Sequence, residues 1–298
     1  MHEKRLVWIG AWRYALNKWL KEFDLEGKVT VITGAGGELC GAMARAFGEM
    51  GARVALLDLS GESASKNADI IKQHGGSANA FECNVLDSDN LKQVCSAIED
   101  AWGIPDILIN GAGGNHPSGT TDLEQYNEGD AENPDIKTFF DLEEDGVRAV
   151  FDLNFLGSFI PTQVIGRRMI ERGRGAILNI SSMNHYTPLT KIPAYAAAKA
   201  AIANFTAWLA VHFAKTGVRV NAIAPGFLMT EQLKFLHIDQ QTGELTPRAK
   251  KVIAHTPMGR YGDPEELIGA VIWLLSDAAR FVTGVTVPID GGFSSYSI

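Results

Sequence analysis

The chain has 298 residues, of which 46% are hydrophobic and 21% are charged, and this ordinary globular composition excludes collagen-like, disordered and coiled-coil proteins. A formal net charge of −8 argues against nucleic acid as a partner, because polyphosphate backbones are bound by basic surfaces. The cysteines, Cys40, Cys83 and Cys95, are an odd number in a long chain and lack the spacing of metal ligands. We therefore expect no disulfide framework, no metal site and a cytoplasmic location.

Residues 1–24 predict an amphipathic helical extension. At helical spacing, Trp8, Trp12, Ala15, Trp19 and Phe23 fall on one stripe. The apolar run is too short and too charged to span a bilayer, and no cleavage site of a signal peptide follows it. We expect the stripe to pack on its own domain or on a sister subunit, with a membrane-surface anchor as the alternative.

From residue 28 onward, short aliphatic or β-branched runs alternate with longer helical patterns. This alternation predicts an α/β fold, in which one doubly wound parallel sheet is covered by helices on both faces. No repeat or linker interrupts it, so we expect one domain over residues 25–298. The predicted strands cover residues 29–33, 53–58, 78–84, 107–110, 175–180, 218–223 and 285–289. The predicted helices cover residues 39–50, 63–74, 88–102, 146–171, 194–215 and 264–276.

Two stretches interrupt the alternation. The first is an insertion at about residues 114–146, in which residues 121–146 hold ten acidic side chains and one basic side chain, and we expect it to be solvated. The second is a loop at about residues 226–257, which follows a predicted strand. Long loops in that position often close over ligands, so we interpret this one as a substrate loop.

A glycine-rich turn links the first predicted strand to the first predicted helix. Gly34, Gly36 and Gly37 let the backbone approach a pyrophosphate, whose charge is stabilised by the helix N-terminus. Asp58 ends the second predicted strand, where an acid can bind the hydroxyls of an adenosine ribose. A carboxylate there would repel a 2′-phosphate, so the pattern predicts NAD(H) as the preferred cofactor, with NADP(H) as the alternative.

Tyr195 and Lys199 are four residues apart and share one face of a predicted helix. A tyrosine is a poor base at neutral pH, but an ammonium group beside it stabilises the phenolate and lowers its pKa. Ser182 precedes this pair at the carboxyl edge of a predicted strand, where α/β sheets place groups that contact ligands. Taken alone, a tyrosine and a lysine at this spacing are most often a surface pair, so the interpretation of this pair as an acid–base group depends on the other motifs of the chain.

Several motifs occur in order along the chain, and together they resemble those of the short-chain dehydrogenase/reductase family over residues 25–293. Beyond the glycine-rich turn at residues 33–40, they are the segment 110–113, Asn154, Ser182, the segment 195–199 and Pro225-Gly226. The resemblance implies a Rossmann-like sheet of order 3-2-1-4-5-6-7 and a homo-oligomer, either dimer or tetramer.

The chain departs from the family pattern at four positions. Glu38 and Cys40 stand where glycines are usual, Gly111 stands where asparagine is common, and Asn84 replaces an aspartate that contacts adenine. These departures affect the details of pyrophosphate and adenine contact rather than the location of the site.

The resemblance also implies roles for individual residues. Ser182 would hydrogen-bond the reacting oxygen, and Tyr195 would exchange a proton with it. Lys199 would also hold the nicotinamide ribose, and Asn154 would support a water that relays the proton. The residues implied to bind the cofactor are Gly34, Gly36, Gly37, Leu39, Asp58, Asn84, Val85, Asn110, Ala112, Gly113, Tyr195, Lys199, Pro225, Gly226 and Thr230.

The closer resemblance is to the D-mannonate oxidoreductase (fructuronate reductase) branch of this family, and residues 113–117, 187–195 and 255–260 carry it. A sugar-acid substrate requires a cation for its carboxylate and neutral groups for its hydroxyls. The candidates are Asn115, His116, Asn184 and Lys191. We therefore expect interconversion of D-fructuronate and D-mannonate.

Three alternative functions stay open. The first is oxidation of another polyol or of a sugar acid such as gluconate. The second is reduction of a 3-oxoacyl thioester, which the polar substrate candidates disfavour. The third is a binding module that senses NAD without turnover, which the intact catalytic set disfavours.

Overall fold

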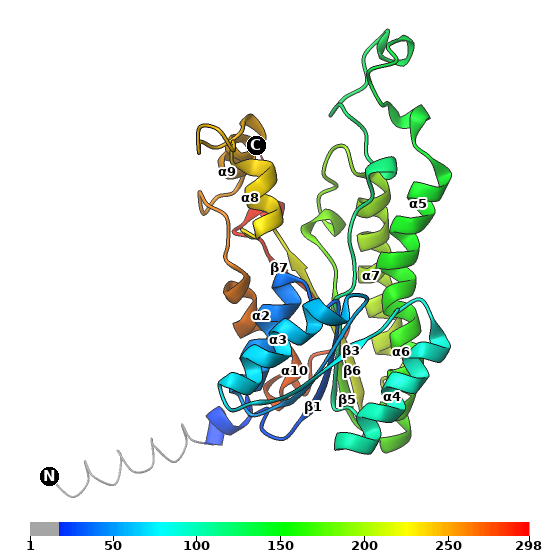
Figure 1. The fold of residues 1–298 in the computed structure, drawn as a ribbon, viewed down its shortest axis with the longest axis vertical. Helices are drawn as coiled ribbons and strands as arrows, with labels where there is room; N and C mark the ends of the chain where they lie inside the picture. Colours follow the sequence, from blue (N-terminus) through cyan, green and yellow to red (C-terminus); the bar gives the residue numbers. More distant parts are fainter. Residues whose placement is uncertain (1–17, 298) are drawn as a thin grey trace, which may run out of the picture.

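The computed structural model describes residues 18–297, and its centre is a seven-stranded parallel sheet (Figure 1). The strand order is β3-β2-β1-β4-β5-β6-β7, which confirms the order implied by the family resemblance. Every neighbouring pair of strands is parallel. The strands are β1 (Val29–Thr33), β2 (Arg53–Asp58), β3 (Ser77–Glu82), β4 (Ile107–Asn110), β5 (Gly175–Ile180), β6 (Val218–Pro225) and β7 (Thr286–Ile289).

Helices cover both faces of the sheet, as predicted (Figure 1). One face packs against α2 (Glu38–Glu49), α3 (Gly61–Gln73) and α10 (Ile268–Leu275), and the other packs against α4 (Ser88–Trp102), α6 (Gly157–Arg172) and α7 (Pro193–His212). The strands alternate between the two layers: Val31 and Ile32 are both fully buried, but they belong to opposite hydrophobic clusters. This double burial explains why the strands consist of continuous apolar runs.

The predicted helix over residues 146–171 is not one regular helix. It consists of α5 (Glu144–Phe151), a π-helical turn at Asp152–Leu156, and α6. The periodicity of the sequence could not reveal the π turn, because such a turn shifts the helical pattern of apolar residues only slightly. Such π turns are frequent at functional sites, and this one contains Asn154.

The two predicted interruptions contain short elements. The insertion includes three 3-10 turns, at Pro117–Gly119, Asp130–Glu132 and Phe139–Asp141. The substrate loop contains α8 (Glu231–His237) and α9 (Pro247–His255). Helix α9 packs on a small cluster with Phe227 and Tyr261, and His237 of α8 contacts the same two rings. Both stretches lie at the same end of the molecule, above the carboxyl ends of the strands (Figure 1).

Most of the predicted N-terminal stripe lies outside the described residues. Trp19 and Phe23, its described members, are 59% and 37% exposed, so they are not packed into the domain core. Over residues 18–297, none of the helices combines the length and the apolar character needed to cross a bilayer.

Candidate active site

The predicted catalytic side chains meet at the carboxyl edge of the sheet. Ser182 follows β5 by two residues, and Tyr195 and Lys199 lie in the first two turns of α7. Pro193 at the start of α7 suits the first helical turn, where a missing N–H costs nothing. In an open α/β sheet this edge is where ligands bind.

Lys199 is buried beneath Tyr195. It is 5% exposed, its Nζ donates to the carbonyl of Ile180 at 2.9 Å, and Nζ lies 5.6 Å from the centroid of the Tyr195 ring. Burial lowers the pKa of Lys199 to about 8. The helical spacing of the two residues therefore produces the predicted proximity.

The pKa of Tyr195 differs in direction from the prediction. Burial raises it, and a hydrogen bond with Ser182 only partly opposes that effect. The prediction of a lowered Tyr195 pKa is wrong for the protein alone, because removing water from the phenolate costs more than the neighbouring groups recover. The phenol is therefore protonated at neutral pH.

Asn154 connects the π turn to the segment that follows β4. Its side chain is fully buried, and its Nδ2 donates to the carbonyls of Gly114 at 2.7 Å and Val150 at 2.8 Å. Its Oδ1 accepts from the N–H of Gly114 at 3.3 Å. A Cβ at Gly113 would lie 2.7 Å from this Oδ1 and 3.1 Å from Lys199 Nζ, so a glycine is required there. Asn154 thus holds the loop after β4 against the catalytic lysine.

The glycine-rich turn has the shape required of a pyrophosphate site. Gly34 adopts a φ of +65°, and a Cβ there would lie 2.9 Å from backbone atoms of Ala112. The N–H of Gly36 donates to Asp58 Oδ2 at 2.9 Å, and a Cβ at Gly36 would meet the same oxygen at 2.9 Å. The turn, the start of α2 and the acid of β2 therefore meet at one place, so these residues fit a dinucleotide.

Two departures from the family pattern compensate each other. A Cβ at Gly111 would overlap the sulfur of Cys40 and would lie 2.7 Å from the carbonyl of Thr33. The thiol of Cys40 occupies the space that a larger residue at position 111 would need, and burial raises its pKa to about 12, so it stays neutral. Thr33 Oγ1 accepts from the N–H groups of Gly111 at 3.0 Å and Ala112 at 3.2 Å, which ties the turn to the end of β4.

The side chain of Asn110 points into the protein. Its Nδ2 donates to Asn179 Oδ1 at 2.8 Å and to Thr162 Oγ1 at 3.0 Å, and Asn179 in turn donates to Thr206. Only the backbone of Asn110 is available at the sheet edge. Its predicted contact with the cofactor is therefore restricted to the main chain.

The other predicted cofactor residues surround the same edge. Asn84 is exposed and accepts from the N–H of Leu86, whereas Val85 is buried. Gly226 follows β6, and Thr230 caps α8 by accepting from the N–H of Leu233 at 3.2 Å. Leu39 is partly buried in the first turn of α2. These contacts stay predictions.

Two of the four predicted substrate residues line one cavity: Asn184 and Lys191 border a space of about 560 Å³ at the start of α7. Asn115 donates to Thr120 Oγ1 at 2.8 Å, and Nδ1 of His116 accepts from the N–H of Ser118 at 3.2 Å, so both are used within the first turn of the insertion. Lys191 is half-buried on the segment before α7, with a φ of 72° and its carbonyl bonded to the N–H of Thr121 at 2.9 Å. Asn184 is buried directly beside Ser182.

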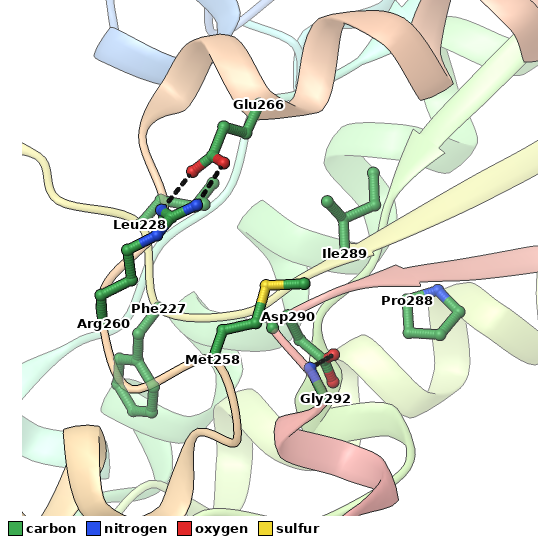
Figure 2. A pocket seen from close by; sticks show the side chains of 11 residues that line it. Phe227, Leu228, Met258, Arg260, Glu266, Pro288, Ile289, Asp290 and Gly292 are labelled. Carbon is green, nitrogen blue, oxygen red and sulfur yellow. Dashed lines mark hydrogen bonds and ion pairs between the residues drawn. The ribbon is translucent and has the colours of Figure 1, made fainter.

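A cavity of about 360 Å³ lies beside the ends of β6 and β7 (Figure 2). Arg260 on its wall forms two hydrogen bonds of 2.7 Å with the carboxylate of Glu266, drawn as dashed lines in Figure 2. These bonds lower the pKa of Glu266 to about 2. In the protein alone, Arg260 is therefore paired with a carboxylate of its own chain.

Sequence reasoning missed the contacts that join the surrounding segments. Lys251 of α9 pairs with Glu124 of the acidic insertion at 3.1 Å, so the insertion and the substrate loop touch each other. Glu38 accepts from the N–H of Glu231 at 2.8 Å, which connects the glycine-rich turn to α8. No sequence signal pairs residues so far apart. Within residues 18–297, no cluster of His, Cys, Asp or Glu has the geometry of a metal site.

The fold and this set of side chains define an oxidoreductase that acts on CH–OH groups. The chain belongs to the short-chain dehydrogenase/reductase family, and a family model described as Enoyl-(Acyl carrier protein) reductase matches its residues 37–294.

Relatives of known sequence or structure span nearly the whole chain. A crystal structure from Haemophilus influenzae with bound NAD, provisionally described as a D-mannonate oxidoreductase, is 52% identical with a TM-score of 0.88, over 92% of this chain and 97% of that one. An uncharacterized oxidoreductase of Bacillus subtilis, UxuB, is 48% identical over 92% of this chain and 97% of its own length. The NAD-dependent glycerol dehydrogenase of Listeria innocua is 35% identical over 92% and 96%, respectively.

Proposed function

We propose that this protein is an NAD-dependent oxidoreductase that interconverts D-fructuronate and D-mannonate by hydride transfer. The observation that carries the proposal is the convergence of Ser182, Tyr195 and Lys199 beside the glycine-rich turn. The similarity to the Haemophilus influenzae structure, with its bound NAD and its description, supports both the cofactor and the substrate.

The glycine-rich turn and Asp58 would hold the dinucleotide, whose nicotinamide supplies or accepts the hydride. Asp58 already accepts N–H groups from Gly36 and Ser60, both at 2.9 Å, so its carboxylate lies within the turn. A fixed negative charge there disfavours the 2′-phosphate of NADP(H).

The catalytic residues would divide the work on the substrate oxygen. Tyr195, protonated at neutral pH, donates its proton to the carbonyl oxygen during reduction and recovers it during oxidation. Lys199 places a buried ammonium beneath the ring, and this charge stabilises the phenolate that forms in each cycle. Asn154 keeps the loop after β4 in contact with this pair.

Lys191 would bind the substrate carboxylate. Its left-handed backbone is unfavourable for a lysine, and such strain is found at functional sites. Lys191→Met keeps much of the length and removes the charge. We expect KM for D-fructuronate to rise about 10- to 100-fold, while KM for NADH stays unchanged, because a charged hydrogen bond contributes about 1.5–3 kcal/mol. If KM for D-fructuronate and KM for NADH are both unchanged, another residue binds the substrate carboxylate, and His116 is the next residue to test.

The proposal is tested by following the absorbance of reduced nicotinamide with a panel of substrates. The panel contains D-mannonate, gluconate, glycerol and other polyols as alcohols, and D-fructuronate and a 3-oxoacyl thioester as carbonyl compounds. The expected result is the highest kcat/KM with D-mannonate and D-fructuronate, and a preference for NAD(H). A higher kcat/KM for another compound would identify that compound as the better substrate. Binding of NAD without turnover of any compound in the panel would indicate a binding module.

A polyol dehydrogenase is the second candidate. The 35% identity to the Listeria innocua glycerol dehydrogenase favours it, since a neutral polyol needs no cation. Wild-type activity of the Lys191→Met variant on a polyol would support this alternative.

We also propose a homo-oligomer, dimer or tetramer, in the cytoplasm. Exposed apolar side chains of the π turn and α7 support a subunit interface: Leu156, Trp208 and Val211 are 37%, 57% and 79% exposed. The free, buried cysteines fit a reducing compartment. Light scattering of the purified protein tests the first point, and fractionation of cells tests the second.

A further inference from the structure

The hydroxyl of Ser182 is bonded twice by the same neighbouring residue. Its Oγ accepts from the backbone N–H of Asn184 at 3.2 Å and from the side-chain Nδ2 of Asn184 at 3.1 Å. The Oδ1 of Asn184 accepts from the N–H of Leu189 at 2.8 Å. Ser182 and Asn184 are only 6% and 4% exposed, so bulk water does not compete for these bonds.

The orientation of the Asn184 amide follows from its partners. The N–H of Leu189 can only donate, so the atom that faces it must be the amide oxygen. The atom that faces Ser182 is then the NH₂ group, which can only donate. A flipped amide would place two donors against each other at Leu189.

A serine hydroxyl has two acceptor lone pairs and one donor hydrogen. Asn184 uses both lone pairs, so Ser182 has only its hydrogen left. It can donate that hydrogen to Tyr195, as it does in the protein alone, or to a bound ligand. We propose that Asn184 is a positioning residue that fixes Ser182 as a hydrogen-bond donor to the reacting oxygen, rather than a residue that contacts the substrate. This inference rests on the proposed function, in which Ser182 contacts that oxygen.

The fixed polarity assigns the proton to a single carrier. During oxidation the substrate gives up two groups: the hydride of its C–H bond would go to the oxidised nicotinamide, and the proton of its O–H bond passes to the phenolate form of Tyr195, because Ser182 has no free lone pair to receive it. During reduction the proton returns from Tyr195 to the carbonyl oxygen. Ser182 donates a hydrogen bond to the same oxygen in both directions and keeps its own proton.

Asn184→Asp reverses the polarity at one contact. Its carboxylate can still accept from Leu189, but an acceptor replaces the donor that faces Ser182. The Ser182 hydrogen then turns toward the carboxylate and away from the substrate. We expect kcat on the best substrate of the panel to fall about 10- to 100-fold, as for loss of a strong hydrogen bond, with KM for NAD nearly unchanged. The thermal midpoint should fall as well, because the variant places a carboxylate at a position that is only 4% exposed. The fall in kcat should shrink at low pH, where a protonated carboxyl can donate again.

A double-mutant cycle separates positioning from simple support of the loop. In a Ser182→Ala background, Asn184→Asp should lower kcat by less than about threefold, because the hydroxyl that Asn184 positions is absent. Additive losses, or wild-type kcat in Asn184→Asp, would overturn the inference. If Asn184→Asp does not fold, Asn184→Ala in the same cycle gives the same comparison. Asn133→Asp, in the exposed part of the insertion, controls for the added charge.

The cycle also distinguishes this inference from the proposed function. If Ser182→Ala alone keeps wild-type kcat, Ser182 does not contact the reacting oxygen, and the proposed mechanism fails. If Ser182→Ala lowers kcat strongly while the effect of Asn184→Asp is additive, the mechanism holds and only the role of Asn184 is rejected.

Discussion

The cofactor side and the substrate side of the site are held together by different kinds of contact. On the cofactor side, backbone N–H groups of Gly36, Gly111 and Ala112 bond to side chains of adjacent strands, and the glycines leave no space for a Cβ. On the substrate side, the insertion and α9 meet through Lys251 and Glu124, whose side chains are 70% and 45% exposed. Partly buried backbone hydrogen bonds cost more to break than exposed ion pairs, which contribute little. The comparison indicates a rigid cofactor side and a substrate side that can rearrange around its ligand.

The largest effect should come from the catalytic group between the two sides. Tyr195→Phe removes the proton donor but keeps the ring over Lys199, so kcat should fall about 10²- to 10⁴-fold. NADH affinity, measured by fluorescence titration, should stay nearly unchanged. A variant that keeps more than about a tenth of wild-type kcat would rule out Tyr195 as the acid–base residue.

A smaller effect is expected from the charge on the cofactor side. Asp58→Asn keeps an oxygen that can accept from Gly36 but removes the charge, so repulsion of a 2′-phosphate should disappear. The ratio of kcat/KM for NADH over NADPH should fall about tenfold or more, which corresponds to about 1.4 kcal/mol. Asp58→Ala serves as the comparison, since it also removes the acceptor from the turn. An unchanged ratio in both variants would show that the acid does not face the ribose.

Substitutions at Gly111 and Cys40, which pack against each other, test the rigidity of the cofactor side directly. Gly111→Ala should destabilise the protein by about 1–3 kcal/mol, because the new methyl group overlaps the Cys40 sulfur. Adding Cys40→Gly should recover part of that loss, so the two changes should couple by about 1 kcal/mol in denaturant unfolding. Recovery should be incomplete, because the carbonyl of Thr33 also lies 2.7 Å from the added Cβ. If the losses in unfolding free energy are strictly additive, the side chains at positions 40 and 111 do not interact.

The smallest effect is expected on the substrate side. Lys251→Ala removes an exposed ion pair that contributes about 0.2–1 kcal/mol, so the free energy of unfolding should change by no more than that. We expect kcat/KM to change by less than about fivefold and the difference to shrink as salt is added. A tenfold loss that persists in high salt would mean that closure of the insertion on α9 is part of catalysis.

Local sequence patterns were sufficient to predict several features of this protein. The continuous apolar runs, the glycine-rich turn and the spacing of Tyr195 and Lys199 were enough to predict the α/β class and the proximity of the catalytic pair. The family resemblance added the strand order, which the structure confirms. These features could be predicted because helical spacing and double burial leave periodic signals within a few residues.

Tertiary structure alone decided how the side chains in the site are used. The π turn at Asn154, the two bonds from Asn184 to Ser182 and the packing of Cys40 against Gly111 all depend on distances between elements. The raised pKa of Tyr195 has the same origin, because spacing locates the nearby ammonium but does not reveal how much water the fold removes. Helical periodicity specifies which residues share a face, whereas polarity, burial and hydrogen-bond partners are set by what the rest of the chain brings to that face.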